Sequence, residues 1–206
     1  MNKLFSLLLV AGISASTAFA QSGTNIKSIE IGQTIPKSTV KMQTIGKGSI
    51  ALNDVKTRKG LLVMFSCNTC PYVIKSQNRT KEMMDYATSR GIGMVIVNSN
   101  EAYRNEDDSY DAMKKYSKEQ GYKVPYVIDK NSEVADAFGA TRTPEVFLFD
   151  GEGKLIYKGA MEDNPANPTE STQLYLQSAI DNMLAGKAVD PASTKSIGCS
   201  IKRKAS

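Results

Sequence analysis

The sequence contains no histidine and no tryptophan among its 206 residues, and it contains only three cysteines. The absence of histidine excludes an imidazole general base, a histidine-activated cysteine nucleophile and histidine metal ligands. Any catalytic mechanism must therefore rely on cysteine, carboxylates, lysine, arginine, tyrosine and backbone dipoles. Three cysteines also fall short of the roughly four ligands of a structural zinc site, so we expect no metal.

The chain also has little excess charge of either sign. Its formal net charge is +5 at pH 7, and acidic and basic residues are interspersed. The single basic cluster is Lys202-Arg203-Lys204, whereas nucleic-acid-binding proteins usually carry a denser basic stripe with aromatic residues. We therefore expect no nucleic acid among the partners. Hydrophobic residues make up 41% of the chain, which is ordinary for a soluble globular domain with a buried core.

Residues 1–20 have the pattern of an export signal peptide. Lys3 precedes an apolar run at 4–13, and Ala18-Phe19-Ala20 fits the small-x-small rule for cleavage. The run is too short to span a bilayer, and no polar face follows it, as a short buried helix would require. We predict cleavage after Ala20, export to the periplasm or beyond the cell, and no stable membrane insertion of the mature protein. In such compartments disulfides can form and persist.

Segments typical of strands and helices alternate further along the chain, which predicts an α/β fold. We expect strands at 61–65, 92–97, 124–128, 146–149 and 154–158, and helices at 72–90, 109–120, 132–138 and 169–185. A turn at 150–153 joins the last two strands as a hairpin, so the sheet is mixed. The expected organisation is a flexible linker at 21–28, one domain at 29–187 that begins with short β-type stretches, and a C-terminal tail at 188–206.

Two of the cysteines, Cys67 and Cys70, lie between a buried strand and a helix. A helix N-terminus carries partial positive charge and unpaired N–H groups, which favour thiolate over thiol. Because the thiolate is the attacking species in disulfide exchange, we predict a redox pair in which the pKa of Cys67 falls and Cys70 closes the disulfide. The alternatives are a zinc site, which lacks ligands, and a structural disulfide, whose small loop would remove little chain entropy.

Thr143 and Pro144 directly precede the expected strand at 146–149. A proline is tolerated at the start of a strand, which is one explanation of this dipeptide. The other is a cis Thr-Pro bond packed beside the cysteine pair. That arrangement would expose the backbone N–H and C=O of Thr143 for pairing with an extended substrate.

The order of apolar strand, Cys-x-x-Cys, helix, Thr-Pro, hairpin and final helix resembles the thioredoxin superfamily. Three strings, at 65–73, 143–150 and 196–202, are similar to its peroxiredoxin-like, or redoxin, branch. The resemblance implies a thioredoxin-like three-layer α/β/α sandwich with a mixed central sheet and an N-terminal β extension. It also implies an oxidoreductase without a cofactor, with protein disulfides or dithiols as substrates and a further redox partner that the sequence does not identify.

Carried over residue by residue, the resemblance implies that Cys67 is the nucleophile, Cys70 the resolving thiol and Pro144 the cis-proline after Thr143. The strand at 61–66 has no Asp or Glu, so the buried proton-handling carboxylate of thioredoxin is missing there. Glu145 is a candidate replacement because it follows the proline.

Two further residues have two interpretations each. Arg142 either stabilises a thiolate or lies in a solvated loop. Cys199 is either a packed or exposed thiol of the tail, or a third exchange partner that folds back onto the active site.

Two other functions compete with disulfide exchange. An antioxidant thiol peroxidase of this branch needs a Thr or Ser three residues before its cysteine, but Met64 and Cys67 occupy the positions three before Cys67 and Cys70. A copper-handling protein would use thiolates and methionine sulfur. The related copper chaperones also use a histidine, and Met83 and Met84 are better explained as helix core.

Overall fold

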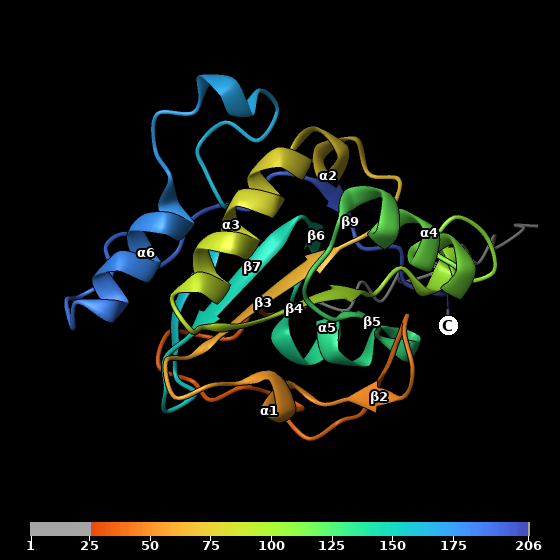
Figure 1. Cartoon of the computed structure of the whole chain (residues 1–206), viewed down its shortest axis with the longest axis horizontal. Helices are drawn as coiled ribbons and strands as arrows, with labels where there is room; N and C mark the ends of the chain where they lie inside the picture. The colour runs from red at the N-terminus through yellow and green to blue at the C-terminus, as the bar shows by residue number, and fades with distance from the viewer. Residues whose placement is uncertain (1–25, 206) are drawn as a thin grey trace, which may run out of the picture.

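A central sheet of seven strands organises the computed structural model, which describes residues 26–205. The expected signal peptide at 1–20 and most of the linker at 21–28 therefore lie outside the described residues. The strand order is β2-β1-β5-β4-β3-β7-β8, and β6 and β9 form a separate two-stranded sheet (Figure 1). The strands are β1 (Met42–Thr44), β2 (Ser49–Ile50), β3 (Leu61–Ser66), β4 (Gly93–Asn98), β5 (Tyr126–Ile128), β6 (Arg142–Thr143), β7 (Glu145–Phe149), β8 (Leu155–Gly159) and β9 (Cys199–Ser200).

Helices cover both faces of the sheet. The α-helices are α1 (Leu52–Val55), α2 (Pro71–Lys75), α3 (Gln77–Ser89), α4 (Tyr110–Gln120), α5 (Glu133–Phe138) and α6 (Tyr175–Leu184), and the 3-10 turns are η1 (Glu101–Tyr103), η2 (Lys130–Ser132) and η3 (Pro168–Glu170). None of the helices within 26–205 is long and apolar enough to cross a membrane.

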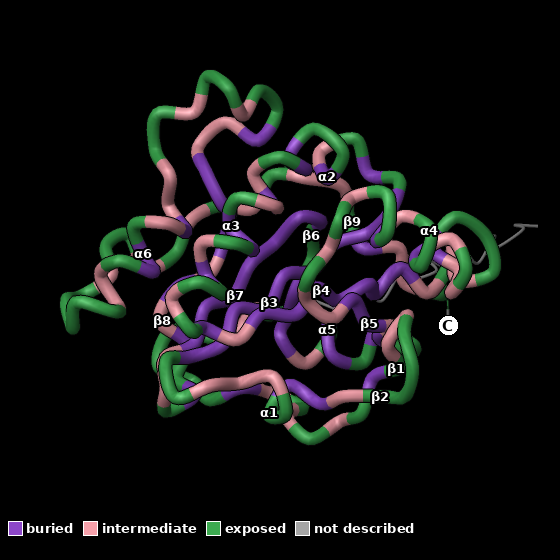
Figure 2. Tube along the Cα trace, in the orientation of Figure 1, coloured by how far each residue is buried: buried purple, intermediate pink, exposed green. Residues whose placement is uncertain are grey.

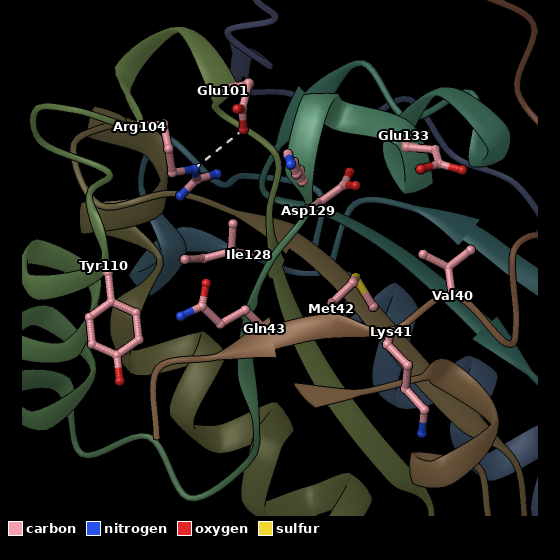
Figure 3. Close-up of a pocket in the computed structure, with 11 residues that line it drawn as sticks. Val40, Lys41, Met42, Gln43, Glu101, Arg104, Tyr110, Ile128, Asp129 and Glu133 are labelled. Carbon is pink, nitrogen blue, oxygen red and sulfur yellow. Dashed lines mark hydrogen bonds and ion pairs between the residues drawn. The ribbon is translucent and has the colours of Figure 1, made fainter. Parts of the chain in front are cut away.

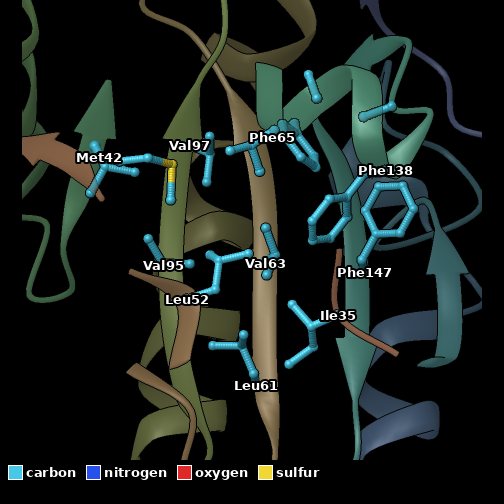
Figure 4. Close-up of a cluster of buried hydrophobic side chains, with 14 of the residues drawn as sticks. Ile35, Met42, Leu52, Leu61, Val63, Phe65, Val95, Val97, Phe138 and Phe147 are labelled. Carbon is cyan, nitrogen blue, oxygen red and sulfur yellow. The ribbon is translucent and has the colours of Figure 1, made fainter. Parts of the chain in front are cut away.

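The central strand β3 is buried along its whole length, as its continuous apolar sequence predicts (Figure 2). Its side chains alternate between two hydrophobic cores. Leu61, Val63 and Phe65 join α1 and α5 in one core, part of which is drawn in Figure 4. Leu62 and Met64 join α3, α4 and α6 in the other. The molecule is thus a three-layer α/β/α sandwich, and the expected fold class is confirmed.

The sheet is mixed, as the hairpin predicts. β3 pairs parallel with β4, which pairs parallel with β5, whereas β7 lies antiparallel to both β3 and β8. The N-terminal extension completes one edge, where β1 pairs antiparallel with β5. Parallel strands end at the same edge of a sheet, so the carboxyl ends of β3 and β4, and the polar residues after them, lie close together.

Two expected helices are wrong in their extent. The helix at 72–90 is two helices, α2 and α3, which meet at Ser76. Past this break, the Gln77 amide donates hydrogen bonds to the hydroxyls of Tyr116 and Tyr122. The helix at 169–185 begins only at Tyr175. The segment before it is held in another conformation because Asp163 accepts hydrogen bonds from the N–H and hydroxyl of Thr172.

The described part of the C-terminal tail runs back over the domain. Its residues around 192–194 bond to the backbone of Lys158 in β8. Further on, β9 pairs with β6, and Ile201 is buried in the core next to α5. This segment therefore reaches the end of β3, where the first two cysteines lie.

Candidate active site at the three cysteines

Cys67, Cys70 and Cys199 form one cluster with Val73 and Tyr72. Cys67 directly follows β3, and Cys70 is the N-cap residue of α2. Pro71 begins α2, where its missing N–H costs no helix hydrogen bond. Cys67 and Cys70 are buried and Cys199 is partly exposed. All three are free thiols, so the structure describes the reduced form.

The Thr143-Pro144 bond is cis, and Thr143 contacts both buried cysteines. Its hydroxyl lies 3.4 Å from the Cys67 sulfur, and its carbonyl accepts a hydrogen bond of 3.2 Å from the Cys70 thiol. The prediction of a cis Thr-Pro bond beside the cysteine pair is therefore confirmed.

The hydrogen bond between Cys67 and Cys70 makes the two thiols unequal. It lowers the pKa of Cys70 to about 4, with further contributions from the Cys199 side chain and the N–H of Val73. The same hydrogen bond, together with burial and the nearby Asp108 charge, raises the pKa of Cys67. The two thiols therefore do not ionise together, because two adjacent thiolates would repel each other.

The raised pKa of Cys67 differs from the expectation that it falls. The largest cause is the hydrogen bond between the two cysteines, and the position at which the helix begins adds to it. Cys70, not Cys67, is the N-cap of α2, so Cys70 is closer to the unpaired N–H groups at the helix start.

The sequence led us to expect that the backbone of Thr143 is open for pairing with an extended substrate. In the structure it is not open. It is paired with Cys199 in the antiparallel ladder between β6 and β9. Gly198 approaches this backbone so closely that a Cβ atom added to it would lie 2.1 Å from the Thr143 carbonyl oxygen. The chain's own tail thus occupies this edge.

Glu145 and Arg142, the two accessory candidates next to Thr143 and Pro144, form hydrogen bonds with the neighbouring backbone and with the C-terminal tail. Glu145 accepts hydrogen bonds from the N–H groups of Thr141 and Arg142, at 2.8 and 3.0 Å, and from the Ser196 hydroxyl at 3.1 Å. Arg142 is exposed and its guanidinium donates a hydrogen bond to the Gly198 carbonyl. The hydrogen bonds found for these two side chains within 26–205 involve none of the cysteines.

A buried carboxylate that the sequence analysis missed fixes the loop between the two cysteines. Asp108 is fully buried. Its carboxylate accepts hydrogen bonds from the Asn68 N–H and from the side chains of Asn98 and Asn100, at 2.9, 2.6 and 2.9 Å. Tyr126 completes the network with a bond to the Asn68 side chain. The available sequence signal was the density of Asn and Asp residues at 98–108, at the end of β4 and directly after it.

A cavity of about 170 Å³ opens onto the cysteines between Tyr103 and Lys202. A larger hollow of about 590 Å³ lies beside the same 100–104 segment and is lined by Glu101 and Arg104 (Figure 3). None of the described cysteines lines the larger hollow. Within 26–205, no group of three or more Cys, Asp or Glu residues is arranged to hold a metal ion.

Comparison with known proteins identifies the family. The Redoxin family model matches residues 30–174. The chain belongs to the Redoxin family. It lies within the thioredoxin superfamily, as the sequence resemblance implied.

Individual relatives agree with this family. The chain is 27% identical over 154 residues to the thiol-disulfide oxidoreductase ResA of Bacillus thuringiensis, an alignment that covers 75% of this chain and 83% of the relative. An uncharacterized conserved protein from Geobacillus kaustophilus has a similar crystal structure, with a TM-score of 0.78, 32% identity, and coverage of 86% of this chain and 94% of that chain. A thioredoxin-like protein in its oxidized form shares the fold, with a TM-score of 0.61 at 20% identity, over 77% of this chain and 99% of that one. This redoxin is thus an oxidoreductase, and that prediction is confirmed.

Proposed function

We propose that this redoxin is an exported thiol–disulfide oxidoreductase whose Cys67–Cys70 pair exchanges with disulfides or dithiols of client proteins. The observation that carries the proposal is the buried pair of thiols at the start of α2, both in contact with Thr143 before the cis-proline. The lowered pKa of Cys70 supports the same conclusion. The name of the Bacillus relatives supports the same chemistry. Export is supported by the signal-peptide pattern at 1–20.

In this proposal Cys70, which is the N-cap of α2 and has the lowered pKa, makes the first attack after it loses the proton that it donates to the Thr143 carbonyl. The Cys70 thiolate attacks one sulfur of the client disulfide and forms a mixed disulfide, while the other client sulfur leaves with the electron pair and takes up a proton. Cys67 then loses its proton and attacks the Cys70 sulfur. The Cys67–Cys70 disulfide forms, the remaining client thiolate leaves, and the client has gained two electrons from the pair. The reverse sequence oxidises a client dithiol.

The charge on Cys70 controls when Cys67 becomes reactive. In the reduced pair the hydrogen bond to Cys70 raises the pKa of Cys67, which keeps it protonated. Formation of the mixed disulfide removes the Cys70 charge, so Cys67 ionises more readily when it is needed as the second nucleophile. Asn68 and Asp108 act as positioning residues that hold the loop between the two sulfurs.

The proposal is tested by mixing the fully reduced protein with a protein disulfide such as insulin and, separately, with hydrogen peroxide. We expect reduction of insulin that is lost in both Cys67→Ser and Cys70→Ser, and a peroxide rate no higher than that of an ordinary thiol. The double variant C67S/C70S is the control for any reaction of Cys199 alone. Rapid consumption of peroxide would instead make the protein a thiol peroxidase and overturn the proposal.

A further inference from the structure

The strand β9 occupies the place beside the cysteine pair where an extended client segment would pair. Cys199 faces Thr143 in the ladder. Its side chain packs against the cluster of Cys67 and Cys70 and lines the same cavity. The Cys70 thiol also donates a hydrogen bond to the Thr143 carbonyl. The tail therefore presents a cysteine to the same sulfur that we expect to attack a client.

Contacts on both sides of Cys199 hold the tail in this position. On one side, Gly198 packs directly against the Thr143-Pro144 bond, where a larger residue would not fit. On the other side, Ile201 is buried in the core. Next to it, Lys202 donates its N–H to the Asn100 side chain at 2.9 Å and accepts a hydrogen bond from the Ala102 N–H at 2.9 Å. The residues on both sides of Cys199 therefore hold it in contact with Cys70.

We propose that β9 is a built-in client of the active site, in which Cys199 serves as a third exchanging thiol and forms a disulfide with Cys70. This inference rests on the proposed function and deepens it. It assigns to the tail the role that an external protein cysteine takes in the general reaction.

The internal exchange needs no additional oxidant or reductant. In the oxidised protein, the Cys199 thiolate attacks the Cys70 sulfur of the Cys67–Cys70 disulfide. The Cys67–Cys70 bond breaks, the Cys70–Cys199 bond forms, and Cys67 leaves with the electron pair and takes up a proton. The disulfide moves from one pair to the other, and the number of oxidised thiols stays the same.

The two disulfides have different consequences for a client. The Cys67–Cys70 bond leaves β9 attached to β6 only by non-covalent contacts. The Cys70–Cys199 bond fastens β9 covalently and keeps the Thr143 edge closed to another strand. It also leaves Cys67 as a free thiol that can attack Cys70 and release the tail again.

The decisive experiment uses the full chain with Cys67→Ser, which leaves Cys70 and Cys199. The reduced variant is mixed with oxidised glutathione and its disulfides are mapped by mass spectrometry. We expect glutathione to attach to Cys70 and then to be released as the Cys70–Cys199 disulfide forms. A stable glutathione adduct on Cys70 beside a free Cys199 would overturn this inference while leaving the proposed function intact. No reaction at Cys70 would overturn both.

A glycine substitution separates the docking of the tail from the chemistry of the thiols. In the Cys67→Ser background, Gly198→Ala introduces a methyl group against the Thr143 backbone. We expect it to slow glutathione release by about tenfold, since an overlap with backbone is costly to relax. The matched control is Gly46→Ala, whose new Cβ would meet only the Thr44 hydroxyl at 3.7 Å. Equal release rates in the two variants would contradict the role of β9.

Discussion

The opposite pKa shifts of Cys67 and Cys70 arise from the hydrogen bond between them and from the residue at which α2 begins. The sequence was sufficient to predict the pair, because a Cys-x-x-Cys follows an apolar run and precedes a helix, with Thr-Pro and a hairpin further on. It was not sufficient to choose the attacking thiol. That choice depends on whether the helix starts after the first or the second cysteine, and helix ends are poorly fixed by sequence.

The hydrogen bond from Cys67 is the largest cause of the low pKa of Cys70, so removing its donor should raise that pKa. Cys67→Ala removes the donor, so we expect the pKa of Cys70 to rise above about 4. Cys70 is a thiolate at any pH above its pKa. If its pKa is higher in the variant, acidification protonates the thiolate at a higher pH. The ultraviolet absorbance of the thiolate measures this titration in the reduced variant.

Cys67→Ser is the matched control for that titration because its hydroxyl can still donate to Cys70. We expect the serine variant to retain a pKa closer to that of the unmodified protein. Identical titrations for the alanine and serine variants would show that the hydrogen bond is not the cause.

The elements around the site were predictable to different degrees. β3 and the hairpin of β7 and β8 carry long apolar patterns and were found from sequence. β9 has only two residues and no periodicity, and its position depends on long-range contacts with β6. The loop at 98–108, which contains η1, is likewise closed by side-chain hydrogen bonds from Asn98 and Asn100 to Asp108, which no periodic pattern reveals.

The network around Asp108 gives a prediction for the loop that joins β4 to α4. In Asp108→Asn, an amide NH₂ replaces one acceptor oxygen and faces the donors that Asp108 now satisfies. We expect a loss of about 1–3 kcal/mol in the free energy of unfolding, measured with urea. The pKa of Cys67 should also fall, because the Asp108 charge helps to raise it.

Asp107→Asn is the control for this prediction, since the Asp107 side chain is exposed and only its backbone carbonyl accepts a bond from Asn68. A purely structural role of Asp108 would lower stability without changing the pH dependence of disulfide exchange. That outcome would remove Asp108 from the positioning residues.

At the scale of the whole molecule, two cores on opposite faces of one sheet hold β3 in place and so position the cysteines at its end. In one core, the Phe138 ring makes edge contacts with Phe65 and Phe147, with ring centroids 5.3 and 5.2 Å away. The three-layer fold was predictable because the alternation of elements and the buried strands are properties of the entire chain.

Phe138→Ala should lower the free energy of unfolding by about 3–5 kcal/mol, since it leaves a cavity among fully buried rings. Leu184→Ala, at a position 40% exposed, should change it by less than about 0.5 kcal/mol. Denaturant unfolding measures both changes. Equal effects of the two substitutions would contradict the assignment of Phe138 to the core.

Trapping the mixed disulfide with a client shows which cysteine attacks first. Reduced C67S/C199A retains Cys70 as its single cysteine together with a hydroxyl donor at position 67, and reduced C70S/C199A retains only Cys67. Each is mixed with a peptide disulfide near neutral pH, quenched with acid and analysed by mass spectrometry. We expect rapid attachment of the peptide to Cys70 in the first variant and much slower attachment to the buried Cys67 in the second. Faster attachment to Cys67, or no attachment to either cysteine, would contradict this expectation.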